Sequence, residues 1–230
     1  MSTTNKTIIS LLLTIVILVS CSKTKKGNMD WDKIYSEQGL EKVKTDSSNI
    51  IVKLRYSTDN NFIGKDVYGN LEEAYLQPEA LKKLYQANEL LTKKNPNLRI
   101  LIWDAARPRR IQQILWDTVD IPLEERSQYV ANPESGSIHN YGCAVDLTLA
   151  DSLGNPIDMG TDYDDFSETA HITDESTLVS NDILTQQQVD NRLILRNVMT
   201  EAGFLTINSE WWHFDAFSRS ETKKRFTIVE

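Results

Sequence analysis

The sequence predicts a single α+β domain in which a central, mainly antiparallel sheet is flanked by helices. A length of 230 residues suits one domain with a sizeable core. Hydrophobic residues make up 40% of the chain and charged residues 25%, which is ordinary for a globular protein. Strand and helix patterns are mixed without a regular βαβ rhythm, and this favours α+β over a doubly wound fold.

The first twenty residues have the pattern of a secretory signal peptide. Lys6 precedes an apolar run over residues 8–19, and Leu-Val-Ser-Cys occupies residues 18–21. A basic start, a short apolar core and small residues at a processing point are typical of such a signal. The ending resembles the lipobox of bacterial lipoproteins, which implies cleavage before Cys21 and lipidation of its thiol. An uncleaved N-terminal anchor is the alternative. Either interpretation places the rest of the chain outside the cytoplasm, in the cell envelope, and anchored to a bacterial membrane.

Three segments are therefore expected along the chain. Residues 1–20 form the signal peptide, residues 21–48 a lipidated N-terminus with a polar, lysine-rich tether, and residues 49–230 the folded domain. The net charge is −8, and residues 1–26 hold four lysines and no acid, so the negative charge gathers in the domain. This balance argues against nucleic-acid binding.

The first predicted elements of the domain are a strand, a loop and a helix. Apolar residues alternate over residues 50–56 and predict a strand, and the turn-forming residues 57–65 predict a loop. Pro78 suits the first turn of a helix because its missing N–H would have no partner there. Leucines then recur at three- and four-residue spacing until Asn95 and Pro96 end the helix.

The middle of the chain contains a strand-to-helix junction. Residues 98–103 predict a largely buried strand, and a further helix is expected beyond Pro108. Arg107 lies at the junction, where side chains are often aimed into a site.

The C-terminal part follows the same mixed pattern. Residues 151–170, rich in glycine and aspartate, predict an irregular loop. A helix is expected near residues 186–202 with Gly203 as its C-terminal stop, and residues 204–217 should return to the sheet.

Residues 137–146 are the part of the sequence hardest to explain as scaffold. His139 and Asp146 flank a turn at Gly142, and the run continues with the alternation of a strand. Side chains an odd number of positions apart on one strand point to opposite faces, so His139 must lie in a turn before the strand. The comparable cluster is Glu210 to His213, where the backbone must likewise bend.

These two clusters can supply the parts of a catalytic zinc site. Such a site usually has three protein ligands and an open position for water, and His139, Asp146 and His213 would supply the three. Glu210 would then be the general base. The structural alternatives are that each histidine is a hydrogen-bonded core residue and that Arg107 is a surface ion-pair partner.

Other chemistry-bearing residues have simpler interpretations. Cys143 could be a zinc ligand or a nucleophile, but a small buried residue on a strand is favoured. We interpret His171 as structural. Asp164 and Asp165, judged on pattern alone, are solvated loop charges. The pair Trp211-Trp212 is core or pocket wall.

Taken together, the motifs resemble a known family. Ser137-x-His139, Gly142-x-Ala144-x-Asp146 and Glu210-x-Trp212-His213 look like those of the VanX-type zinc D-alanyl-D-alanine dipeptidases, within the wider group of zinc D,D-peptidases. The resemblance covers about residues 50–215. Further matching segments lie, in the order of the family, at residues 54–56, 61–69, 103–108 and 159–164.

The resemblance implies a role for each site residue. His139, Asp146 and His213 would bind one zinc ion, Glu210 would be the catalytic base, and Arg107 would stabilise the tetrahedral oxyanion.

Two further positions match residues that hold the free ammonium of the substrate, namely Ser137 and Asp164. One departure is Ala106, which stands where many members of the family have tyrosine. The lipoprotein leader is a second departure, because it would place cleavage on the wall side of the membrane.

The expected function is therefore that of a lipid-anchored zinc dipeptidase that hydrolyses the small dipeptide D-Ala-D-Ala in turnover or scavenging of cell-wall peptide. A D,D-carboxypeptidase that trims peptidoglycan stem peptides is one alternative. A non-catalytic wall-binding lipoprotein is another.

Overall fold

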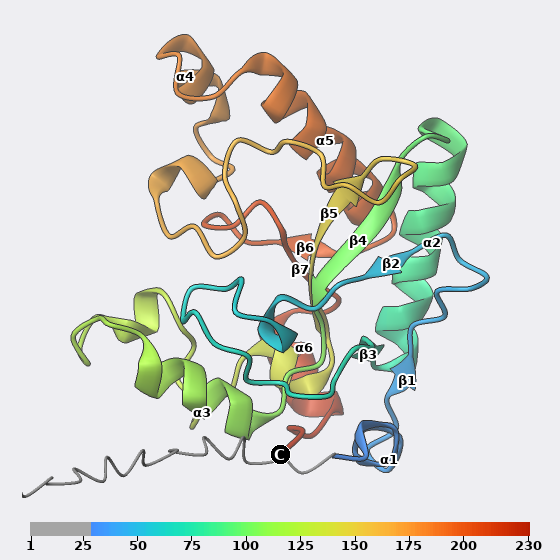
Figure 1. Cartoon of the computed structure of the whole chain (residues 1–230), viewed down its shortest axis with the longest axis vertical. Coiled ribbons are helices and arrows are strands. Elements are labelled where there is room, and N and C mark those ends of the chain that lie inside the picture. Colours follow the sequence, from blue (N-terminus) through green and yellow to red (C-terminus); the bar gives the residue numbers. More distant parts are fainter. Residues whose placement is uncertain (1–28) are drawn as a thin grey trace, which may run out of the picture.

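The computed structural model describes residues 29–230, and its centre is a five-stranded sheet (Figure 1). The strand order is β2-β4-β5-β7-β6. The strands are β2 (Ile51–Val52), β4 (Arg99–Asp104), β5 (Ala144–Ala150), β6 (Leu205–Thr206) and β7 (His213–Asp215). Strands β2 and β4 pair in parallel, and the other three pairings are antiparallel. The prediction of an α+β domain with a mainly antiparallel sheet is confirmed.

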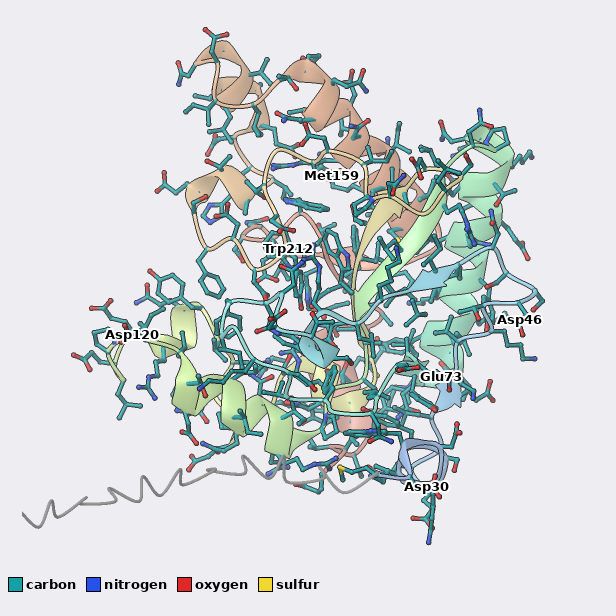
Figure 2. All side chains as sticks on the ribbon, in the orientation of Figure 1. Asp30, Asp46, Glu73, Asp120, Met159 and Trp212 are labelled. Carbon is teal, nitrogen blue, oxygen red and sulfur yellow. The ribbon has the colours of Figure 1, made fainter. Side chains whose placement is uncertain are left out.

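Two long helices support this sheet. Helices α2 (Pro78–Lys94) and α5 (Gln186–Glu201) contact each other, and they contact β4 and β5 respectively. Figure 1 shows α3 (Arg109–Thr118) on the other side of the strands from α2. Side chains fill the space between strands and helices (Figure 2). The shorter helices are α1 (Trp31–Ser36), η1 (Arg55–Ser57), η2 (Arg126–Gln128), η3 (Ile138–Tyr141), η4 (Glu168–Ala170), α4 (Glu175–Ser180) and α6 (Arg219–Arg225).

Helices α2 and α5 begin and end where the sequence predicted. Pro78 occupies the first turn of α2, and Asn95 follows its last residue. Helix α5 begins with a capping box, in which Thr185 accepts from the backbone N–H of Gln188 and the Gln188 side chain accepts from the N–H of Thr185. These local signals depend on neighbouring residues alone, which explains why they could be found in the sequence.

The strand expected over residues 50–56 is shorter than predicted. Only Ile51–Val52 pair with β4, and the chain then enters the 3₁₀ turn η1. The backbone N–H groups of Val67 and Tyr68 both donate to the carbonyl of Tyr56, at 2.9 and 3.0 Å. This fold-back ends the strand and directs Tyr56 inward.

The expected tether was wrong over residues 29–48, which belong to the folded domain. Trp31, Tyr35, Leu40 and Val43 are buried in the main core. In addition, β1 (Glu41–Lys42) pairs with β3 (Tyr75–Leu76) to form a second, two-stranded sheet. The apolar residues are too sparse to show a helix or strand period, and their partners lie far away in sequence. The signal peptide, Cys21 and the start of the expected tether lie outside the described residues.

None of the helices described for residues 29–230 is both long enough and apolar enough to cross a bilayer.

Candidate metal centre and pocket

The turn before β5 places His139. Helix η3 is capped by Ser137, whose Oγ accepts from the backbone N–H of His139 at 3.3 Å. It ends at Gly142, whose φ of 65° lies in the left-handed region that favours glycine. A Cβ at this position would come within 2.6 Å of Leu40 Cδ2. The prediction that His139 lies in a turn formed at Gly142 is confirmed.

The register between β5 and β7 brings the remaining two residues of the predicted ligand set together. Asp146 and His213 are directly paired across the two strands. Bends at residues 208–212 precede β7, as expected for the segment between Glu210 and His213.

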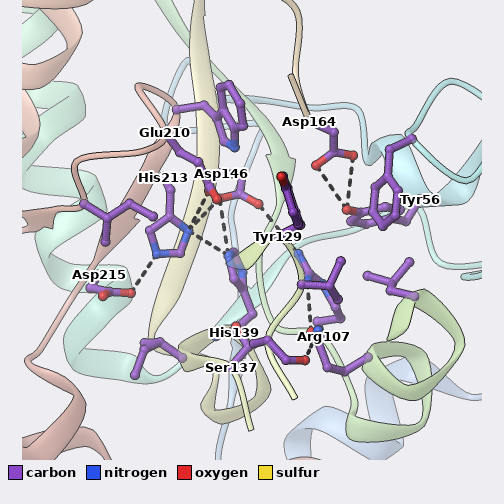
Figure 3. A pocket seen from close by; sticks show the side chains of 18 of the residues that line it. Tyr56, Arg107, Tyr129, Ser137, His139, Asp146, Asp164, Glu210, His213 and Asp215 are labelled. Atoms are coloured by element: carbon purple, nitrogen blue, oxygen red, sulfur yellow. Dashed lines mark hydrogen bonds and ion pairs between the residues drawn. The ribbon is translucent and has the colours of Figure 1, made fainter. Parts of the chain in front are cut away.

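Three atoms converge on one point (Figure 3). His139 Nε2 lies 3.1 Å from His213 Nδ1 and 3.3 Å from Asp146 Oδ1, and the His213–Asp146 edge is 2.9 Å. Ligands at 2.0–2.1 Å from a tetrahedral ion lie roughly 3.3 Å apart. The triangle therefore has the size that a metal ion requires.

The hydrogen bonds of the two histidines also fit a metal ion. His139 Nδ1 donates to the carbonyl of Ala105 at 2.8 Å, and His213 Nε2 donates to Asp215 Oδ1 at 2.9 Å. The opposite nitrogens, His139 Nε2 and His213 Nδ1, face the centre and could bind a metal ion there, because the first nitrogen of each ring already has its own acceptor. The buried carboxylate of Asp146 needs a positive charge beside it, and a metal ion at this centre would supply one.

Asp146 offers only one oxygen to this centre. Its Oδ2 accepts from the hydroxyl of Tyr163 at 2.9 Å and lies 3.7 Å from Arg107 Nη2. Burial alone would raise the pKa of Asp146, but the adjacent His139 and His213 outweigh it and lower the pKa. The carboxylate is thus charged and held as a one-oxygen ligand.

Arg107 is fixed beside the centre by buried partners. Its Nε and Nη2 donate to Asp104 Oδ2 at 2.8 and 2.5 Å, and its Nη1 donates to Gln112 Oε1 at 2.9 Å. The guanidinium lies over the ring of Tyr56 at 5.0 Å. Arg107 is only 7% exposed, so the alternative of a surface ion-pair partner is wrong.

The converging atoms open into a small pocket of about 220 Å³. Glu210 lies at its edge, with Oε2 3.9 Å from His213 Nδ1 and a side chain that is 26% exposed. Burial raises the pKa of Glu210. The pocket is lined by both acidic and basic groups and by aromatic rings, among them Arg107, Ser137, Asp164, Glu210, Trp212 and Arg219.

Asp164 faces the same pocket and is not a solvated loop charge. Its carboxylate accepts from the hydroxyl of Tyr56 at 3.1 and 3.2 Å, and its φ of 60° is unusual for a residue other than glycine. Burial, with the charge of Asp146, raises the pKa of Asp164 well above its ordinary value. Figure 3 shows Asp164 and Tyr56 on one side of Asp146 and Asp215 on the other.

Cys143 and His171, interpreted as structural, do not line the pocket. Cys143 is fully buried immediately before β5, and burial raises its pKa to about 12. His171 ends η4 and does not belong to the converging group. Trp212 is a pocket wall, whereas Trp211 packs behind it and donates from Nε1 to Thr161 Oγ1.

Several pocket residues were missed by the sequence interpretation. Asp215 could have been found, because a residue two positions after His213 on a strand shares its face. Tyr56 and Phe166 carry no local signal, since only the packing of separate loops brings them together. Tyr163, which donates to Asp146 but does not line the pocket, was missed for the same reason.

A candidate metal site of two histidines and one aspartate, beside a glutamate and a buried arginine, is the arrangement of a metal-dependent hydrolase. The comparisons with known proteins agree. The chain belongs to the Peptidase M15 family, described as D-Ala-D-Ala dipeptidase, whose family model matches residues 36–229. This is a family of metal-dependent peptidases.

Relatives of three organisms show the same similarity. A D-alanyl-D-alanine dipeptidase of Escherichia coli K12 is 35% identical over 71% of this chain and 77% of its own length. The one of Synechocystis is 30% identical over 66% of this chain and 72% of its own length. The dipeptidase of Enterococcus faecium is 28% identical over 70% of this chain and 82% of its own length.

Proposed function

We propose that this protein hydrolyses the free dipeptide D-Ala-D-Ala and that its metal is zinc, bound by His139, Asp146 and His213. The observation that best supports this substrate is the position of Asp164, whose carboxylate lines the same small pocket as the candidate metal centre. The names of the relatives support the same substrate. Two imidazole nitrogens and one carboxylate oxygen are a common ligand set of catalytic zinc.

Zinc bound at this centre would supply a Lewis acid for the peptide carbonyl and would lower the pKa of a water molecule. Glu210 takes the proton of the attacking water and returns it to the leaving amine. The raised pKa of Glu210 brings this carboxylate closer to neutral pH, where a general base and acid works best.

Arg107 holds the negative charge that develops on the carbonyl oxygen. Asp104 and Gln112 already fix its guanidinium, so little reorganisation is needed as the charge forms. The dipeptide also carries a free ammonium group at its N-terminus. Asp164 pairs with this group, and Ser137 contributes a hydroxyl in the same pocket.

The pocket also fits a short substrate. Its volume of about 220 Å³ is below the roughly 300–1,000 Å³ that is usual for ligand sites. An enzyme that trims a longer peptide has no free ammonium to recognise at this distance from the scissile bond, so the half-buried carboxylate of Asp164 in the pocket favours the dipeptide.

The N-terminal sequence supports a proposal about location and role. The apolar run after Lys6 and its Leu-Val-Ser-Cys ending favour a lipoprotein anchored through Cys21. The enzyme would then act in the cell envelope, on dipeptide released during turnover of the cell wall or taken up from it.

A two-substrate assay tests the proposal. The zinc-loaded protein is offered free D-Ala-D-Ala and an N-blocked pentapeptide ending in D-Ala-D-Ala, each with and without a chelator. We expect hydrolysis of the free dipeptide and its loss with the chelator. Preference for the blocked pentapeptide would instead indicate a D,D-carboxypeptidase and remove the role given to Asp164. Inertness toward both would overturn the proposed activity.

Glu210→Ala tests the assignment of the base. Turnover of the dipeptide should be lost while the protein still binds one equivalent of zinc, measured by metal analysis after gel filtration. An unchanged rate would exclude Glu210 as the base.

A further inference from the structure

Arg192 is a buried charge that the proposed chemistry does not use. It lies on α5 and is 1% exposed, whereas arginine is rarely buried to this extent without a structural or functional partner. It does not line the pocket of the metal centre. Its two hydrogen-bond acceptors are in the loop of residues 158–170, called here the Asp164 loop.

The guanidinium of Arg192 joins the two ends of the Asp164 loop. Its Nε donates to the carbonyl of Met159 at 2.7 Å, and its Nη1 donates to the carbonyl of Thr169 at 3.0 Å. Asp164 lies midway between these two residues in sequence. One side chain therefore closes the loop at its base and leaves Asp164 at its tip.

Neighbours of Arg192 hold the same loop. Asn191 Nδ2 donates to the carbonyl of Asp158 at 2.8 Å. Arg192 also lies over the ring of Trp211 at 5.7 Å, and Trp211 Nε1 donates to Thr161 Oγ1 at 2.8 Å. Figure 2 shows Met159 beside α5. The loop is thus connected both to α5 and to the segment that carries Glu210.

The loop needs such support because of the conformation at its tip. Asp164 has a φ of 60°, a conformation that costs a residue with a side chain more than it costs glycine. Its carboxylate is turned into the pocket, toward the hydroxyl of Tyr56. A loop free at its base would relax toward ordinary backbone angles and withdraw this carboxylate from the pocket.

We infer that Arg192 is a positioning residue that sets the affinity for the substrate's ammonium by holding the Asp164 loop. The inference rests on the proposed role of Asp164. It places a determinant of substrate binding outside the pocket, on a helix that does not touch the dipeptide.

The chain offers a matched control for the test. Arg196 lies one turn further along α5 and pairs with Glu175 through Nη1 and Nη2, at 3.2 and 2.6 Å. Arg192 Nη1 lies 3.7 Å from the same carboxylate. Both arginines thus face Glu175, but only Arg192 donates to the carbonyls of Met159 and Thr169.

The experiment compares Arg192→Lys, Arg196→Lys and Asp164→Asn, together with the double variant of Arg192→Lys and Asp164→Asn, in the zinc-loaded enzyme. Because lysine cannot reach both carbonyls, we expect Arg192→Lys to raise KM for D-Ala-D-Ala roughly tenfold with kcat within about twofold. Arg196→Lys should leave KM unchanged. In the double variant the effects on KM should not multiply, since both act on one carboxylate.

Hydrogen exchange supplies a readout that needs no substrate. Amides of the Asp164 loop should exchange faster in Arg192→Lys than in Arg196→Lys, and Asn191→Ala should give a smaller increase. Equal exchange and equal KM in the two lysine variants, or effects that multiply in the double variant, would overturn the inference. If the Asp164 loop exchanges faster in Arg192→Lys but Asp164→Asn leaves KM unchanged, Arg192 does hold the loop and the proposed role of Asp164 is wrong instead.

Discussion

Asp146 and His213 are directly paired across strands β5 and β7, and Asp146 Oδ1 lies 2.9 Å from His213 Nδ1. The strand register therefore determines the geometry of the metal centre. A slip of one residue would turn His213 to the opposite face of the sheet. Phe214, the residue after His213 on β7, is fully buried in the core, and the same slip would turn it away from the core.

Zinc should stabilise the folded protein through this pair. A ligand that binds only the folded state at a hundred times its Kd adds about 2.7 kcal/mol to the free energy of unfolding. We expect a higher Tm with zinc than with chelator, and no difference in His213→Ala. His171→Ala serves as the control and should keep the full zinc effect. A zinc effect that survives in His213→Ala would contradict the ligand assignment.

Replacement of Arg107 should slow the chemical step. Arg107→Met removes the fixed cation beside the carbonyl and should lower kcat by about 10²–10³-fold, the cost of losing one preorganised donor. Asp104→Asn should give a smaller loss, because it weakens the contacts that orient Arg107. Arg110→Met changes a neighbouring arginine that lies over Trp31, away from the pocket, and should retain kcat. Retention of kcat in Arg107→Met would contradict the role.

Residues with a local signal were predictable from the sequence. Pro78 and Asn95 bounded α2, and Gly142 indicated the turn that places His139. The clustering of His139 with Asp146, and of Glu210 with His213, identified the two halves of the metal centre before any fold was known.

Residues that act through long-range contacts were not predictable. Tyr163 reaches Asp146 from an irregular loop, and Trp31 packs into the core from a segment that reads as polar. For Asp164, the sequence pattern alone predicts a solvated charge, and only the resemblance to a family predicts a place in the site. Composition and period describe neighbours in sequence, whereas these contacts depend on tertiary packing.

Gly142→Ala should destabilise the protein and weaken zinc binding. The left-handed backbone alone costs about 1–3 kcal/mol for a residue with a side chain, and the new Cβ would press on Leu40. Gly64→Ala is a matched control, since Gly64 has a φ of 63° and open space around its Cβ position. Urea unfolding should show a greater loss of the free energy of unfolding for Gly142→Ala than for Gly64→Ala. In a Leu40→Ala background, the loss caused by Gly142→Ala should be smaller. Equal losses at the two glycines would exclude the contact with Leu40.

Cys143 should make stability fall at alkaline pH. Its pKa is raised by burial from 9.0 to about 12, so the folded protein keeps the proton that the unfolded chain loses above about pH 9. The free energy of unfolding should therefore decrease between pH 9 and 12, by about 1.4 kcal/mol per pH unit from this group. The measurement compares Cys21→Ser with the same protein carrying Cys143→Ala. Their difference in stability should shrink above pH 9, and parallel curves would contradict burial of a protonated thiol.

Trp31→Ala should show that residues 29–48 stabilise the domain. Trp31 is 5% exposed and stacks with Tyr35, whose hydroxyl donates to the carbonyl of Ala106 beside Arg107. Loss of a buried tryptophan costs about 3–5 kcal/mol. Met29→Ala, at a residue 39% exposed, should be nearly neutral in thermal unfolding. Similar Tm values for the two variants would restore the interpretation of this segment as a tether.

The order of the ligands along the chain has a consequence for biosynthesis. His213 begins β7, the last strand of the described chain, and reaches Asp146 only after β7 has paired with β5. A growing polypeptide that has already made His139 and Asp146 still lacks the third ligand. Binding of the ion by all three residues therefore has to follow the synthesis and pairing of β7, and uptake of the ion can report that β7 has joined the sheet.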